Sequence, residues 1–158
     1  SYSLYADSLG SWFNDNVSEE WTSLRARLMA LLSDEASLDE IVKLVGMDAL
    51  SPTDRLKMET ARSIREDFLH QLAFHEVDTY SSLRKQYLMM KLVLRFYDGS
   101  LDALKKGANI EKLVSIPSRE SIGRFKYVHE NDIEDTYKTV CAAIDSEIKA
   151  AVDAREDY

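Results

Sequence analysis

The chain has 158 residues, enough for one domain with a sizeable core, and its 5 glycines and 2 prolines are too few for many short strands and tight turns. Acidic residues outnumber basic ones by 28 to 20, and the formal net charge of -8 argues against non-specific binding of nucleic acid, which needs clustered cations. The single cysteine, Cys141, cannot form an internal disulfide and favours an intracellular protein.

No run of about 18 or more apolar residues is present, so no transmembrane helix is predicted. The start of the chain has neither a signal-peptide pattern nor a methionine, and residues 1–5 already follow an amphipathic pattern. We therefore expect a domain that was cleaved or excised from a longer protein.

Apolar residues at three- and four-residue spacing predict a first helix that begins after Ser18. Its apolar face would consist of Trp21, Leu24, Leu28, Leu31 and Leu32. A capping box, Ser37-Leu38-Asp39-Glu40, predicts a second and separate helix that ends at Gly46. The apolar side of this short helix would hold Ile41, Leu44 and Val45.

The stretch Ser51-Pro52-Thr53-Asp54 combines an N-cap, a proline at the first helical position and an early acid, and it predicts a helix to about residue 70. Residues 71–81 lose the periodicity and predict a structured loop. Ser81 or Ser82 then caps the most apolar helix of the chain, which Asp98-Gly99-Ser100 is expected to end. This helix has two apolar stripes, as is typical of a central, buried helix: Leu83, Tyr87, Met90, Leu94 and Tyr97 on one, and Leu88, Leu92 and Phe96 on the other.

Short helices are predicted around 101–106 and 110–115, with Gly107 as a C-terminal cap and Pro117 as a stop. Asn131-Asp132-Ile133-Glu134 begins a long last helix. One stripe of this helix would hold Ile133, Tyr137, Val140, Ile144, Ile148 and Val152. With no strand, repeat or linker in the pattern, we predict a single all-α helical bundle over residues 1–158.

A search for catalytic and metal-binding motifs finds none that is complete. No glycine belongs to a phosphate loop, and Thr79 stands where a zinc protease motif beginning at His75-Glu76 would need its second histidine. Asp67 and His70 have the spacing of a di-iron carboxylate–histidine pair, but the second pair is missing. Cys141 lies on the apolar side of the last helix and is expected to be packed rather than reactive. The pattern alone thus predicts a helical domain without catalytic residues or a metal site.

Residues 40–54 read Glu-Ile-Val-Lys-Leu-Val-Gly-Met-Asp-Ala-Leu-Ser-Pro-Thr-Asp, and they resemble the lever segment of rotary ATPase catalytic subunits. In F-type beta subunits this segment contains the motif Asp-Glu-Leu-Ser-Glu-Glu-Asp, which pushes on the rotor. Asp48, Leu50, Ser51 and Asp54 match the motif, whereas Ala49, Pro52 and Thr53 depart from it as V/A-type A subunits do. The resemblance implies that residues 48–54 form a lever that faces the rotor.

Residues 63–80 are similar to the adjoining run of V/A-type A subunits, and so are 1–5, 85–87 and 122–127. In that family the Gln-x-Ala-Phe element helps to wall the adenine pocket. The resemblance therefore implies that Phe74 lies against adenine, with Gln71 and Ala73 beside it. His70 and Leu72 depart from the more usual polar residues of this run.

The resemblance as a whole implies the all-helical C-terminal domain of the catalytic A subunit of a V/A-type rotary ATPase. The phosphate loop and the catalytic glutamate would lie upstream, so this fragment would hold no catalytic residue, cofactor or metal, and the parent subunit would use ATP or ADP with Mg. The domain would couple ATP hydrolysis or synthesis to rotation and to proton or sodium ion transport.

The implied partners are the B subunits of a hexameric head and the rotor subunits of the central stalk, with no nucleic acid and with the membrane reached only through the complex. The implied location is cytoplasmic and peripheral to the membrane. Two alternatives stay open: a free-standing helical adaptor that binds a protein partner through an exposed groove, and a small enzyme with a scattered active site. The absence of an initial methionine weighs mildly against the adaptor.

Overall fold

The computed structural model describes residues 20–69 and 82–155, including their side chains except those of residues 68 and 69. Its helices are α2 (Trp21–Val45), α3 (Pro52–Ile64), α5 (Leu83–Lys105), α6 (Ile110–Val114), α7 (Ser118–Arg124) and α8 (Ile133–Asp153). Short helical turns join them: η1 (Met47–Ala49), the π-helical η2 (Arg65–Leu69), η3 (Phe125–Tyr127) and η4 (Glu130–Asp132). No strand occurs in the described ranges, so the predicted all-α class is confirmed.

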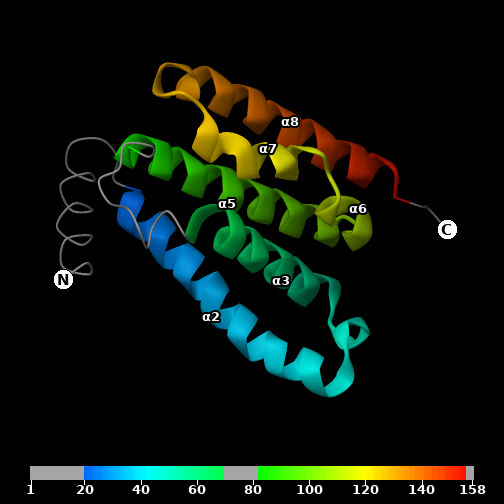
Figure 1. Ribbon diagram of the computed structural model, residues 1–158. Helices are drawn as coiled ribbons and strands as arrows, with labels where there is room; N and C mark the ends of the chain where they lie inside the picture. The colour runs from blue at the N-terminus through cyan, green and yellow to red at the C-terminus, as the bar shows by residue number, and fades with distance from the viewer. Residues whose placement is uncertain (1–19, 70–81, 156–158) are drawn as a thin grey trace, which may run out of the picture.

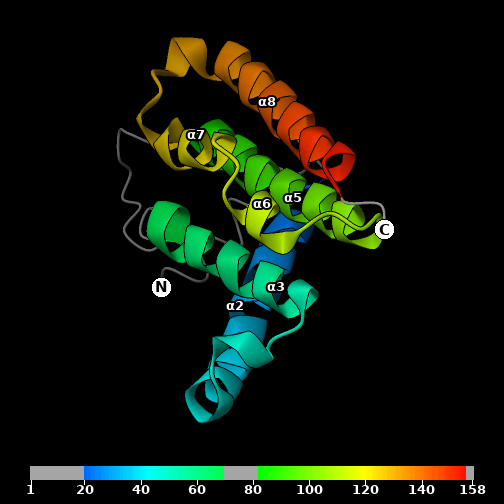
Figure 2. The same cartoon turned by 90° about the vertical axis from the view of Figure 1, so that its right-hand side faces the viewer.

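Helix α5 forms the centre of the bundle. It packs against α2 and α3 on one side and against α7 and α8 on the other, which gives the layered arrangement of Figures 1 and 2. Both predicted stripes face neighbours, and the helix buries Leu88, Met89, Met90, Leu92, Val93, Leu94, Phe96 and Tyr97. The prediction of a central helix is therefore confirmed.

Several predicted helix boundaries are confirmed because they rest on local hydrogen bonds. The backbone N–H of Asp54 donates to the Ser51 hydroxyl at 3.1 Å, and that of Lys85 donates to the Ser82 hydroxyl at 3.0 Å. Gly107 follows α5 with a φ of +95°, as expected of a C-terminal glycine. The last helix begins at Ile133 and buries Ile133, Val140, Cys141, Ile144, Ile148 and Ala151.

The prediction of a separate helix beginning at Ser37 is wrong, because α2 runs without a break to Val45. Leu38 is buried and extends the face formed by Leu28 and Leu31, so packing against α3 favours the helical backbone here over a capped break. Ion pairs from α3 and η2 support the same stretch. Arg65 donates to Glu35 at 2.7 Å, and Lys57 lies 3.5 Å from Asp34.

The predicted stop at residues 98–100 is also wrong, since α5 continues to Lys105 and no separate helix spans 101–106. Gly99 lies inside the helix against α8, where an added Cβ would come within 2.9 Å of the Ile148 Cδ1 atom. The glycine thus permits a close helix–helix approach instead of ending the helix.

Pro117 does more than stop a helix, because it precedes α7, which the sequence pattern did not predict. The Glu147 carboxylate of α8 accepts a hydrogen bond of 2.8 Å from the backbone N–H of Ser118. A side chain 29 residues away therefore caps the start of α7, a role that no local motif reveals. In the ranges described, no helix is long and apolar enough to cross a membrane.

Candidate functional site

The end of α2, the turn η1 and the start of α3 project away from the rest of the bundle, and we call residues 40–54 the tip (Figures 1 and 2). Gly46 ends α2 with φ +89° and ψ 163°, a conformation that is essentially restricted to glycine. Apart from the adjoining backbone, no atom of the described residues lies within 4 Å of the place where a Cβ would stand, so the backbone conformation and not the space requires glycine. The Ser51 cap and Pro52 then set the start of α3.

An apolar patch covers the tip. Leu44 is 84% exposed, Val45 63%, Ile41 45% and Met47 43%. No helix of the described chain covers Ile41, Leu44 and Val45, the apolar residues of the predicted short helix. Single exposed apolar residues are ordinary, whereas a contiguous group of this kind marks an interaction surface.

The seven predicted lever residues all lie in this tip. Asp48, Ala49, Ser51, Pro52 and Thr53 are exposed, and Leu50 and Asp54 are partly buried. The structure therefore brings them together beside Met47 and Val45, two apolar residues that the lever prediction did not include. The signal that could have found them was their apolar character next to a glycine that ends the helix.

The tip contains three carboxylates and one cation, Lys43. Within the described residues, Glu40, Asp48 and Asp54 form no ion pair, while Asp39 is 3.2 Å from Lys43. The tip therefore offers an apolar surface with a negative rim, which fits a partner surface with apolar residues and cations.

Helices α2 and α3 support the tip as a braced pair. Leu28, Leu31, Leu56 and Ile64 are buried in the common core, and polar contacts reinforce their packing. Arg65 of η2 donates to both carboxylate oxygens of Glu35, and this hydrogen bond raises the pKa of the Arg65 guanidinium. Arg27 makes a two-pronged contact with Asp98 of α5, at 2.6 and 3.0 Å.

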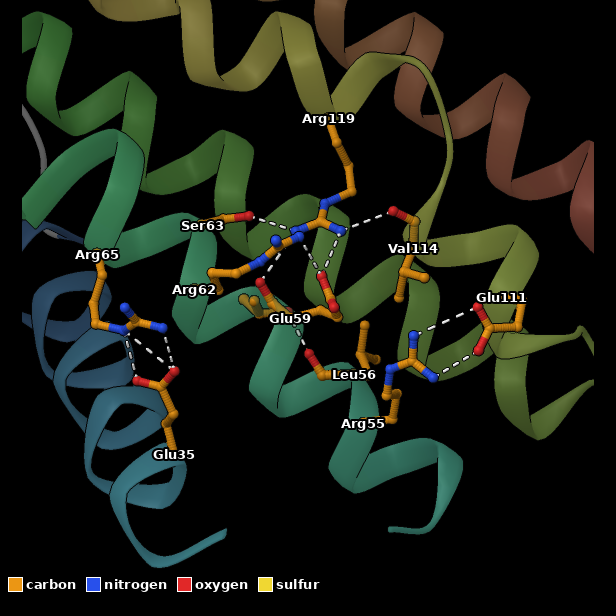
Figure 3. Close-up of polar contacts among 11 residues, drawn as sticks. Glu35, Arg55, Leu56, Glu59, Arg62, Ser63, Arg65, Glu111, Val114 and Arg119 are labelled. Carbon is orange, nitrogen blue, oxygen red and sulfur yellow. Dashed lines mark hydrogen bonds and ion pairs between the residues drawn. The ribbon is translucent and has the colours of Figure 1, made fainter. Parts of the chain in front are cut away.

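A polar network ties α3 to α6 and α7, and Figure 3 shows its members. Arg119 of α7 donates to the Glu59 carboxylate at 3.1 Å and the Ser63 hydroxyl at 2.6 Å, and also to the backbone carbonyls of Glu59 and Val114. Glu59 also accepts a hydrogen bond of 2.8 Å from Arg62. Burial alone would raise the pKa of Glu59, but the hydrogen bonds and charges of Arg119 and Arg62 outweigh it and lower this pKa.

A cleft of about 390 Å³ lies next to this network, between α3 with η2 and the segment that connects α6 to α7. Its polar lining includes Arg62, Ser63, Glu66, Asp67, Arg119 and Glu120. Burial raises the pKa of Asp67, against the opposing charge of Lys126. The cleft has charges of both signs but no paired nucleophile and base, and the described residues contain no group of three or more metal-ligating side chains.

The predicted adenine-contacting residues Phe74, Gln71 and Ala73 lie outside the described residues, as does His70. Their roles remain predictions. Cys141 is buried and unpaired on α8, as the prediction of a packed cysteine requires.

Comparisons with known proteins point to the same family as the lever segment. Residues 10–114 match the family described as the C-terminal domain of V and A type ATP synthase. The chain is 51% identical over 152 residues to the V-type ATP synthase alpha chain of Acetivibrio thermocellus, which covers 96% of this chain and 26% of the relative.

Two further relatives agree. The V-type ATP synthase alpha chain of Thermoanaerobacter pseudethanolicus is 55% identical over 152 residues (96% of this chain, 25% of the relative), and that of Clostridium novyi is 58% identical over 134 residues (84% and 23%). The chain therefore spans about a quarter of the length of the relatives that it matches. It belongs to the family formed by the C-terminal domain of V- and A-type ATP synthases.

Proposed function

We propose that this chain is the C-terminal helical domain of the catalytic A subunit of a V/A-type rotary ATPase, and that its tip transmits force to the central stalk. The observation that carries the proposal is the exposed apolar tip on a braced pair of helices. Burying Leu44 against a partner would contribute about 1.5–3 kcal/mol, a contribution that the described chain leaves unused. Membership of the family supports the rotor of the central stalk as this partner.

A lever must be rigid and must also bind its partner. Gly46 and the Ser51 cap define the turn at both ends, and the Glu35–Arg65 contact joins α2 to the far end of α3. A load applied at Met47 would therefore reach the bundle through two helices and not through a loose loop. Residues 1–158 would act as one body in this role.

The second part of the proposal concerns the nucleotide. Phe74, with Gln71 and Ala73, would complete the adenine pocket of the parent subunit, as the resemblance of residues 63–80 implies. The parent would hydrolyse or synthesise ATP with Mg, coupled to transport of protons or sodium ions. It would assemble with B subunits in the head and with rotor subunits, at the cytoplasmic side of the membrane and peripheral to it.

The test of the lever uses the complete A subunit assembled into the head. Leu44→Gln should weaken binding of the purified central-stalk subunits about ten-fold or more, because ten-fold corresponds to about 1.4 kcal/mol and a buried Leu contributes at least as much. Met29→Gln is the matched control, since Met29 is an exposed apolar residue of the same helix outside the tip. Equal binding by both variants and the parent would contradict the proposal.

The size of the native polypeptide distinguishes the proposal from a free-standing adaptor, which would use the same apolar tip. An antibody against this domain should detect a polypeptide several times larger than the chain, in a membrane-bound complex with ATPase activity. A soluble polypeptide of 18.1 kDa would favour the adaptor.

A further inference from the structure

We propose that Arg119 is a positioning residue for force transmission, which makes the tip-bearing helix α3 move together with α6, α7 and α8. The inference rests on the proposed function, because it concerns the same lever. It is carried by an observation that the proposed function did not use. The guanidinium of Arg119, on α7, donates hydrogen bonds to both α3 and α6 (Figure 3).

The contacts of Arg119 use the geometry of the planar guanidinium. The Nη1 atom donates to Glu59 Oε2 of α3 at 3.1 Å and to the carbonyl of Val114, the last residue of α6, at 2.8 Å. The Nη2 atom donates to Ser63 Oγ at 2.6 Å and to the Glu59 carbonyl at 3.1 Å. The guanidinium carbon also lies 5.0 Å from the centre of the Phe96 ring on α5. Lysine, with one nitrogen at the end of a flexible stem, cannot reproduce this fork.

Burial makes these contacts strong. The side chain of Arg119 is 13% exposed and that of Glu59 is 18% exposed, so water screens their charges little. The ion pair between α3 and α6, from Arg55 to Glu111, is more open, with exposures of 26% and 65%. Such exposed pairs contribute less.

The packing around Arg119 explains why a polar link matters at this border. Helix α3 directs its buried residues Leu56, Ala61 and Ile64 into the core shared with α2 and α5. Toward α7 the border instead contains the open cleft lined by Ser63, Asp67 and Glu120. Both layers pack on α5, and across the cleft itself the hydrogen bonds of Arg119 form a direct polar link from α3 to α7.

A rigid connection has a mechanical consequence. The tip lies at the start of α3, so the reaction force from a partner at the tip acts along this helix. If α3 can slide against α7, part of each stroke deforms the domain instead of turning the partner. The loss should grow with the opposing load, because a softer lever yields further under a larger force.

The experiment uses the intact ATPase complex in vesicles, with Arg119→Lys in the complete A subunit. We expect ATP hydrolysis without a load to stay close to the parental rate, while the number of ions moved per ATP falls by about two-fold or more against a steep opposing gradient. Arg55→Gln is the matched control, because it breaks only the exposed link of the same helix and should keep the parental ratio at every load.

Comparison with Leu44→Gln distinguishes a failure of this inference from a failure of the proposed function. If Leu44→Gln lowers the ratio and Arg119→Lys keeps it at every load, the lever stands and the role of Arg119 is overturned. If Leu44→Gln also keeps the ratio, the proposed function itself fails. A role of Arg119 in stability alone would lower the yield of assembled complex and leave the ratio unchanged, and this result would overturn the inference. If Arg119→Lys does not assemble, Glu59→Gln, which keeps the size of the partner and removes its charge, is held to the same criterion.

Discussion

Gly46→Ala should destabilise the domain, although an alanine side chain has ample room there. With φ at +89° and ψ at 163°, Gly46 occupies a region in which other L-residues are strained by about 1–3 kcal/mol. Alanine would recover about 0.4–1 kcal/mol by restricting the unfolded chain. At the midpoints of these two ranges the net loss in the free energy of unfolding is about 1.3 kcal/mol, or about 3–5 °C in Tm for a chain of this size.

Thermal unfolding of the 158-residue chain, followed by circular dichroism, measures this change. Gly107→Ala is the comparison, because Gly107 has a φ of +95° and a Cβ there would meet its nearest atom at an ordinary 3.5 Å. It should show a similar loss, whereas Ala49→Ser, at an exposed position of the same tip, should change Tm little. A rise in Tm for Gly46→Ala, as at an ordinary helical glycine, would refute the reasoning that backbone conformation selects Gly46.

Three further predictions concern packing, pH and nucleotide binding. Gly99→Ala should be more favourable in the Ile148→Val chain than in the wild-type chain, because only in the wild-type chain must the Ile148 Cδ1 atom move away from a 2.9 Å contact with the new Cβ; additive effects in denaturant unfolding would contradict this. Because the folded-state pKa of Glu59 is lowered from 4.5, its ionised form contributes stability above pH 4.5 that is lost as the pH falls through the lower folded value. Glu59→Gln should thus lower Tm at neutral pH and lose its effect in acid, and a pH-independent difference would count against the ionic role. Phe74→Ala in the complete subunit should weaken nucleotide affinity, measured by titration with ATP, more than it lowers Tm, and unchanged affinity would leave Phe74 as a packing residue.

The sequence by itself determined the class of the fold and those helix ends that depend on near neighbours. The Ser51 and Ser82 caps join atoms three residues apart, so they can be recognised without knowing what packs against the helix. The apolar stripes of α5 and α8 were equally readable: the two stripes of α5 predict a helix in the interior, and the single stripe of α8 predicts a helix packed on one side. The family resemblance predicts a lever at residues 48–54, and the structure places those residues at one projecting tip.

Tertiary structure decided whatever depends on residues distant in the chain. Helix α2 continues past the Ser37 capping box because it packs against α3. Gly99 lies inside α5 and permits a close approach of Ile148 from α8. The exposure of Leu44 could not be read from its apolar character, because burial depends on whether another helix covers it. Arg119 reaches Glu59 across 60 residues of sequence. Periodicity and capping record only local interactions, whereas burial and long-range hydrogen bonds arise from how the finished helices meet.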